Sequence, residues 1–368
     1  MPAPRPNIQA LAPYTPGEQP TWQDTGRPER PVIKLNTNEN PYPPSPPVMR
    51  AIADVPAEAL RLYPPPRADR FRAAAAAAHG LTPDHVIATN GGDELLRMLI
   101  ATWLTPGTSA TLGVTHPSYS LYSVLTDIHG VGTHAVDRDP DTLAPPPVAE
   151  LAAAWNDANC PLAFFVNPHA PSGRLESLDD LTRLADTFDG LLLIDEAYVD
   201  FAPHDAVPLV AAGRDDVVLL RSLSKGYGLA GLRFGYGIAH PDVIRTLDAV
   251  RDSYNTDVLA QVAATAALTH RDLARQTWQN VIAERERTTA RLTDAGWTVL
   301  PSHSNFVLCT PPAGAPDAAD LHAALKRRDI LIRHFNTPPI AGRLRISIGT
   351  PEQMDQLITA LNEILGNP

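Results

Sequence analysis

The chain has 368 residues, enough for two domains with sizeable cores, and its 44% hydrophobic and 19% charged residues exclude a disordered or fibrous protein. Its 30 Lys and Arg against 41 Asp and Glu give a formal charge of −11 without a basic stripe, which argues against nucleic acid or an anionic membrane as partner. The apolar runs are too short to span a bilayer, and the first residues lack a signal-peptide pattern. Cys160 and Cys309 lie in apolar contexts without metal spacing, so we expect a cytoplasmic protein without a metal.

Proline-rich segments dominate the first 66 residues, in EQP, NPYPPSPP and YPPP. Because proline disfavours regular structure, residues 1–30 are predicted to form an extended N-terminal arm. The stretch RADRFRAAAAAAHG at 67–80 then predicts a helix, since alanines propagate helix well and Gly80 supplies a left-handed stop.

Short apolar runs that predict buried strands then alternate with helix-like segments; these runs are 85–90, 109–115, 162–167, 191–195 and 217–222. The alternation predicts an α/β fold with a mostly parallel central sheet and crossover helices, in a large domain over 31–250. After that the pattern changes to long amphipathic helices and short strands at 304–310, 330–334 and 343–348. We expect a smaller α+β domain over 251–368.

Polar residues follow several of these strands, and open α/β sheets bind ligands at the carboxyl ends of their strands. The turn at 91–94 (GGDE) leaves backbone N–H groups free at a helix start, which suits a phosphate. Tyr119 follows the second strand, and the polar turn at 167–173 follows the third. Asp195 comes directly after four buried aliphatic residues, where a carboxylate is costly unless a cation meets it.

The stretch SLSKGYGLAGLRFGYG at 222–237 places Lys225 among serines and glycine, eight residues before Arg233. Pyridoxal phosphate needs a lysine for its Schiff base, a carboxylate for its pyridine nitrogen, donors around its phosphate and a hydrogen-bond partner for its phenolic oxygen. Lys225 and Asp195 supply the first two. The remaining groups are supplied by Ser222, Ser224, Arg233, Gly91, Gly92, Asp93, Glu94, Asn167 and Tyr198.

Six segments carry a family resemblance through their order and spacing: KLNTNENP (34–41), LYPPP (62–66), NGGDE (90–94), DEAYVDF (195–201), SLSKGYGLAGLRFGYG (222–237) and LRISIGT (344–350). Through them the chain resembles the fold-type I pyridoxal-phosphate aminotransferases, and among these the histidinol-phosphate aminotransferases, over nearly its whole length. The resemblance implies a transaminase of histidine biosynthesis. It would interconvert histidinol phosphate and 2-oxoglutarate with imidazole acetol phosphate and glutamate by a ping-pong mechanism.

By this resemblance Lys225 anchors the cofactor and moves the substrate proton, and Asp195 keeps the pyridine nitrogen protonated. Asn167 and Tyr198 resemble the residues that bond the phenolic oxygen, and Tyr119 resembles the aromatic residue that stacks on the ring. The implied phosphate ligands are Ser222, Ser224, Arg233 and, from the second subunit of an obligate homodimer, Tyr63.

Two arginines near the C-terminus resemble the substrate ligands of the family. Arg345 resembles the residue that grips the carboxylate of glutamate or 2-oxoglutarate, and Arg333 resembles one that meets the phosphate of histidinol phosphate. Tyr14 matches an N-terminal tyrosine that closes over that phosphate. Two guanidinium groups would serve two anionic substrates.

The sequence departs from the family pattern at two places, and it leaves two other functions open. His169 and Ala170 stand in the loop that usually carries a second asparagine, and Gly92 replaces a usual serine. An aromatic amino acid aminotransferase, with Arg333 silent, and a phosphothreonine decarboxylase of the same fold are the alternatives. A pyridoxal-phosphate-binding regulator is discounted, because the residues before the first strand leave no room for a DNA-binding domain.

Overall fold

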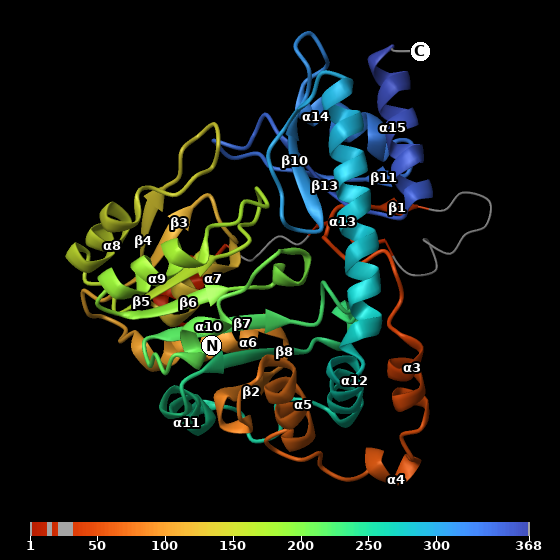
Figure 1. Cartoon of the computed structure of the whole chain (residues 1–368). Coiled ribbons are helices and arrows are strands. Elements are labelled where there is room, and N and C mark those ends of the chain that lie inside the picture. The colour runs from red at the N-terminus through yellow and green to blue at the C-terminus, as the bar shows by residue number, and fades with distance from the viewer. Residues whose placement is uncertain (1, 13–16, 21–31, 367–368) are drawn as a thin grey trace.

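The computed structural model describes residues 2–12, 17–20 and 32–366 of the chain (Figure 1). Within residues 86–239 it contains a seven-stranded sheet in the order β2-β8-β7-β6-β5-β3-β4. β8 pairs antiparallel with β2 and β7, and the other neighbouring pairs are parallel. The strands are β2 Val86–Thr89, β3 Thr111–His116, β4 Gly132–Asp137, β5 Leu162–Val166, β6 Leu191–Asp195, β7 Val217–Ser222 and β8 Gly235–Ala239. The predicted mostly parallel sheet is confirmed.

Helices cover both faces of this sheet (Figure 1). Alternate residues of a strand point to opposite faces, so in β6 Leu192 and Ile194 enter one core while Leu191 and Leu193 enter the other. The first core includes residues of α5 Asp69–His79, α8 Val148–Asp157, α9 Leu178–Thr187, α10 Val207–Ala211 and α12 Val258–Thr269. The second includes residues of α6 Gly91–Trp103, α7 Leu121–His129 and α11 Pro241–Val250.

Two strands of the sheet, β4 and β8, lie outside the predicted set. β4 is the edge strand and its side chains are mostly exposed, so it lacks the apolar run that marks a buried strand. β8 contains Gly235 and Gly237. A Cβ at Gly237 would lie 3.0 Å from side-chain atoms of Ile87 and Leu95, so glycine lets α6 pack closely on the sheet.

The C-terminal part has its own antiparallel sheet within residues 298–347, in the order β12-β13-β10-β9. Its elements are α13 Arg271–Asp294, β9 Thr298–Val299, β10 Phe306–Thr310, α14 Ala318–Lys326, β11 Ile330–Leu331, β12 Arg333–His334, β13 Leu344–Ser347 and α15 Pro351–Leu365. β11 pairs in parallel with β1 Ile33–Lys34 in a separate two-stranded sheet, which brings the N-terminal segment to the C-terminal part. The remaining α-helices in the described part of the chain are α1 Pro6–Gln9, α3 Pro46–Ala53 and α4 Ala57–Leu60. The domain boundaries at residues 30 and 250 stay predictions.

A buried ion network lies under the central strands. Arg221 of β7 places Nε 2.7 Å from Glu196 Oε2 and Nη2 2.9 Å from Asp205 Oδ2. The Arg221 and Glu196 side chains are almost completely buried. Burial raises the pKa of the Glu196 carboxyl to about 7, against the field of Arg221. The guanidinium is therefore required to neutralise the carboxylates beneath the sheet.

We expect Arg221→Met to lower the free energy of unfolding by about 3–5 kcal/mol, because it leaves the Glu196 carboxylate buried without its cation. Urea denaturation followed by tryptophan fluorescence measures this loss. Arg245→Met is the matched control, since Arg245 makes an exposed ion pair with Asp242 worth at most about 1 kcal/mol. Equal losses of unfolding free energy in the two variants would show that the buried ion pair contributes no more to stability than the exposed one.

Candidate active site

A cavity of about 790 Å³ opens at the carboxyl ends of β3, β6 and β7. One wall comes from the large sheet and includes Asp195, Ser222 and Lys225. The opposite wall comes from the C-terminal strands and includes Arg333 and Arg345. Both parts of the chain therefore build one cavity, of a size typical of sites for cofactors and small substrates.

Lys225 lies in the turn after β7, half-buried in the lining of this cavity. Its Nζ donates a hydrogen bond to the carbonyl of Thr37 at 2.9 Å. Burial, together with the positive charge of Arg345, lowers the pKa of the Lys225 amine to about 8. A larger share of this amine is neutral near pH 7 than of a free lysine, which suits a nucleophile or base. A Cβ at the following Gly226 would lie 2.2 Å from a carboxylate oxygen of Asp200, so glycine is needed there.

Asp195 ends β6 with its carboxylate at the cavity. Its Oδ2 accepts a hydrogen bond from the Tyr122 hydroxyl at 2.7 Å, and its Oδ1 accepts one from the Ala197 N–H at 3.0 Å. Burial raises the pKa of Asp195, and a cation placed against it would lower that pKa again. Tyr122 also meets the ring of Tyr119 edge to face at 5.5 Å. Tyr122 is absent from the predicted site residues, and no sequence pattern links it to Asp195, which lies 73 residues further on.

The start of α6 and the turn after β7 form an anion cradle. Ser224 N–H donates to Ser222 Oγ at 3.1 Å, and Arg233 Nη1 lies 3.4 Å from Ser224 Oγ. Gly91 begins α6 with φ +72°, and a Cβ there would lie 2.8 Å from Arg233 Nη2. The cradle thus holds hydroxyls, a guanidinium and the positive end of a helix, the donor set that a phosphate prefers. Asp93 adds a carboxylate to the cradle, and its Oδ2 lies 3.6 Å from Arg233 Nη2.

The two residues predicted to bond a phenolic oxygen lie at different depths. Tyr198 lines the cavity, and its hydroxyl accepts a hydrogen bond from Asn38 Nδ2 at 3.0 Å. Asn167 is buried behind the lining, where its Oδ1 accepts from the Glu176 N–H at 2.8 Å and its Nδ2 donates to the Glu176 carbonyl at 3.2 Å. Contact of Asn167 with a cofactor stays a prediction.

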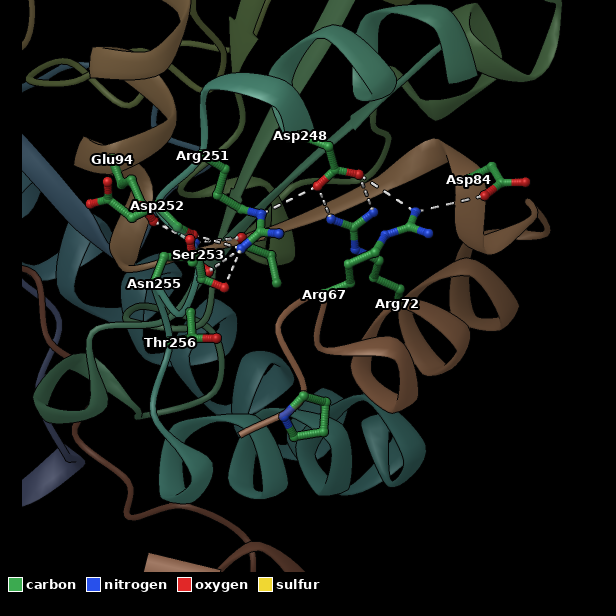
Figure 2. A network of polar contacts seen from close by, with 12 residues as sticks. Arg67, Arg72, Asp84, Glu94, Asp248, Arg251, Asp252, Ser253, Asn255 and Thr256 are labelled. Carbon is green, nitrogen blue, oxygen red and sulfur yellow. Dashed lines mark hydrogen bonds and ion pairs between the residues drawn. The ribbon is translucent and has the colours of Figure 1, made fainter. Parts of the chain in front are cut away.

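Gly92 lines the cavity, whereas Glu94 belongs to the polar network of Figure 2 and is not part of the lining. The Glu94 carboxylate accepts hydrogen bonds from Asn255 Nδ2, at 2.8 Å, and from the backbone N–H of Asn90. From there the network runs through Arg251, Asp248 and Arg72. Glu94 therefore fixes the start of α6, and its direct contact with a phosphate stays a prediction.

Of the two predicted tyrosines of the N-terminal region, the structure describes Tyr63, which is not brought to the cavity in one chain. Tyr63 is 80% exposed and stacks on Tyr254 with ring centroids 4.4 Å apart, outside the cavity lining. Tyr14 lies outside the described residues. Both stay predictions.

Arg333 and Arg345 are cross-strand partners on β12 and β13. Both guanidinium groups lie near the ring of Phe335, at 5.5 and 5.4 Å, and Arg345 also lies 5.3 Å from the ring of Phe306. Arg345 Nη2 donates to the carbonyl of Asn36 at 3.0 Å. This register puts two fixed cations on one wall, where they can hold two anionic groups.

Residues 36–39 also line the cavity, although the sequence marks them only as part of a motif. Among residues 2–12, 17–20 and 32–366 no group of His, Cys, Asp and Glu side chains is arranged to bind a metal ion. In the same ranges no helix has the length and apolar character needed to cross a bilayer.

Comparisons with known proteins agree with this geometry. The family described as aminotransferase class I and II matches residues 30–361. Histidinol-phosphate aminotransferase 1 of Trichormus variabilis is 41% identical over 361 residues, covering 98% of each chain. Histidinol-phosphate aminotransferase of Sinorhizobium meliloti, solved in complex with pyridoxal-5'-phosphate, is 27% identical with a TM-score of 0.86, covering 98% of this chain and 97% of that one. The chain belongs to the class I and II aminotransferase family, and the predicted family resemblance is confirmed.

Proposed function

We propose that the protein is a pyridoxal-phosphate-dependent transaminase of histidine biosynthesis. It interconverts histidinol phosphate and 2-oxoglutarate with imidazole acetol phosphate and glutamate. The observation that carries the proposal is one cavity with Lys225 and the buried Asp195 on one wall and Arg333 and Arg345 on the other. The relatives named histidinol-phosphate aminotransferase, about 40% identical over nearly the full length, support the same substrate.

The cavity residues fit the cofactor group by group. Lys225 would attach it covalently, Asp195 would face its ring nitrogen, and Tyr119 would lie on its ring. The phosphate would enter the anion cradle of Ser222, Ser224, Arg233 and the start of α6. When bound, pyridoxal phosphate supplies an electron sink for the pair left by the broken substrate C–H bond.

The protein's own groups then handle charge and protons. Lys225 Nζ, with its pKa lowered to about 8, can accept the proton from the substrate carbon and return it. Asp195 presents a carboxylate whose two oxygens already accept from Tyr122 and Ala197, so its orientation is fixed before any ligand arrives. Arg345 would hold the substrate α-carboxylate and Arg333 the distal phosphate.

We also propose that the protein is a cytoplasmic homodimer. Of the seven large hydrophobic side chains that are exposed in the described part of the chain, six lie in two segments: Met49, Leu60, Leu62, Tyr63, Val250 and Tyr254. The two segments meet where Tyr63 stacks on Tyr254, and exposed apolar side chains of this kind favour a protein partner; a second copy would cover them and direct its Tyr63 to the phosphate. Location in the cytoplasm stays a prediction.

Attachment to Lys225 can be tested cleanly because the chain has three lysines, Lys34, Lys225 and Lys326. After incubation with pyridoxal phosphate and reduction with borohydride, mass spectrometry should find the added mass on Lys225. Lys225→Ala should abolish the label and lower the transamination rate by roughly a thousandfold or more, because anchor and base are lost together. Lys34→Ala is the control and should keep the label. Normal turnover of Lys225→Ala would contradict the assignment.

The role of Arg333 is tested by comparing the two half-reactions. Arg333→Ala should lower kcat/KM for histidinol phosphate by roughly ten- to a hundredfold or more, since a charge-assisted contact is lost. The half-reaction with glutamate should suffer less, because Arg345 still holds the α-carboxylate. Arg328→Ala, on the surface, serves as control.

Equal losses in both half-reactions would remove Arg333 as a phosphate ligand. A wild type that prefers phenylalanine to histidinol phosphate would indicate an aromatic amino acid aminotransferase. Release of carbon dioxide from threonine phosphate would indicate the decarboxylase.

The dimer is tested by complementation. Tyr63→Ala should raise the dissociation constant of pyridoxal phosphate by about ten- to a hundredfold if the hydroxyl binds the phosphate. When the Tyr63→Ala and Lys225→Ala chains are co-expressed, about half of the dimers are mixed, and one of the two sites in each mixed dimer has both native residues. The mixture should therefore show about a quarter of the wild-type activity at limiting cofactor. A monomer in sedimentation velocity, or no recovery in the mixture, would exclude sharing of the site.

A further inference from the structure

His169 is a fully buried side chain next to the cavity whose two ring nitrogens are both engaged. Nε2 lies 2.9 Å from the carbonyl oxygen of Pro117, and Nδ1 lies 2.8 Å from the hydroxyl of Ser172. Because a carbonyl can only accept, Nε2 carries the hydrogen, and Nδ1 of the neutral ring accepts from the Ser172 hydroxyl. Ser172 Oγ in turn accepts from the N–H of Arg174 at 3.2 Å.

The loop holds this ring in one state and one place. Burial, with the positive charge of Arg138 nearby, lowers the pKa of His169 well below its ordinary value, so the ring stays neutral. The backbone of His169 donates to the Arg174 carbonyl at 2.7 Å and accepts from the Gly173 N–H at 2.6 Å. The ring therefore has one tautomer on a closed turn, and its Nε2–H points at a fixed acceptor.

That acceptor belongs to the segment that carries Tyr119. Pro117 follows β3, and Pro117 and Tyr119 both line the cavity. Tyr119 meets Tyr122 edge to face, and Tyr122 donates to Asp195. The His169–Pro117 hydrogen bond thus ties the turn after β5 to the turn after β3, whose Tyr119 ring packs on Tyr122, the donor to Asp195.

We propose that His169 is a positioning residue that holds the Pro117–Tyr119 segment, and with it the Tyr119 ring, in place for the cofactor ring. The inference rests on the proposed function, since it takes Tyr119 to lie on that ring. His169 acts through Tyr119 and touches neither substrate nor cofactor.

The test is a double-mutant cycle read on the dissociation constant of pyridoxal phosphate and on the visible circular dichroism of the bound cofactor. His169→Leu should raise the dissociation constant of pyridoxal phosphate by about tenfold, because one buried hydrogen bond is lost, and it should reduce the circular dichroism of the bound cofactor. His169→Gln can still donate to the Pro117 carbonyl and should restore most of both signals. In a Tyr119→Ala background, His169→Leu should change the affinity by less than about twofold.

The control is His79→Leu, which removes the partly buried His79 ring that contacts the Tyr236 hydroxyl at 3.0 Å, and it should leave the cofactor affinity unchanged. Equal losses from His169→Leu in both backgrounds, or no rescue by His169→Gln, would overturn the positioning role and leave the proposed function standing. A wild type that fails to bind pyridoxal phosphate would overturn both.

Discussion

The burial of the Asp195 carboxylate is the constraint on which the site depends. A carboxylate without a positive partner is costly at the end of a central strand, and burial raises the pKa of Asp195 accordingly. The Tyr122 hydroxyl and the Ala197 N–H each satisfy one oxygen but supply no charge. A positive group placed against Asp195 would therefore lower its pKa and offset part of the cost of burying the carboxylate.

The register of the strands beside Asp195 places Asn167 and Lys225 near the same end of the sheet as its carboxylate. Asp195 pairs with Val166 of β5 and Leu220 of β7, so the turns that follow these strands open at the same edge. One turn carries Asn167 and the other Lys225. The antiparallel β8 then returns Gly235 against the start of α6, where a Cβ would lie 2.8 Å from Gly91, and this close approach closes the anion cradle. The cradle and the carboxylate are thus fixed by the same sheet.

Much of the fold and of the cavity could be predicted, because both follow from local patterns. The buried parallel strands are apolar runs, and Lys225, Ser222 and Arg233 fall in one glycine-rich motif. Tyr122 could not be assigned in this way, since its partner is 73 residues away and their contact depends on how α7 packs on the sheet. The same holds for Glu94, whose partner Asn255 comes from the segment after α11. Side-chain partners of this kind are set by tertiary packing, which propensity and spacing do not encode.

The segment KLNTNENP shows why a motif can be specific without containing a catalytic side chain. Its backbone carbonyls accept from both walls of the cavity, Asn36 from Arg345 at 3.0 Å and Thr37 from Lys225 at 2.9 Å. Asn38 adopts a left-handed conformation, φ 57°, and bonds Tyr198 on one side and Ser347 on the other. Because asparagine tolerates this conformation better than most residues, the sequence is restricted here by backbone geometry as well as by side-chain contacts. The segment links the amine of Lys225 to the guanidinium of Arg345, so the distance between these two groups on opposite walls of the cavity is set by one short stretch of backbone.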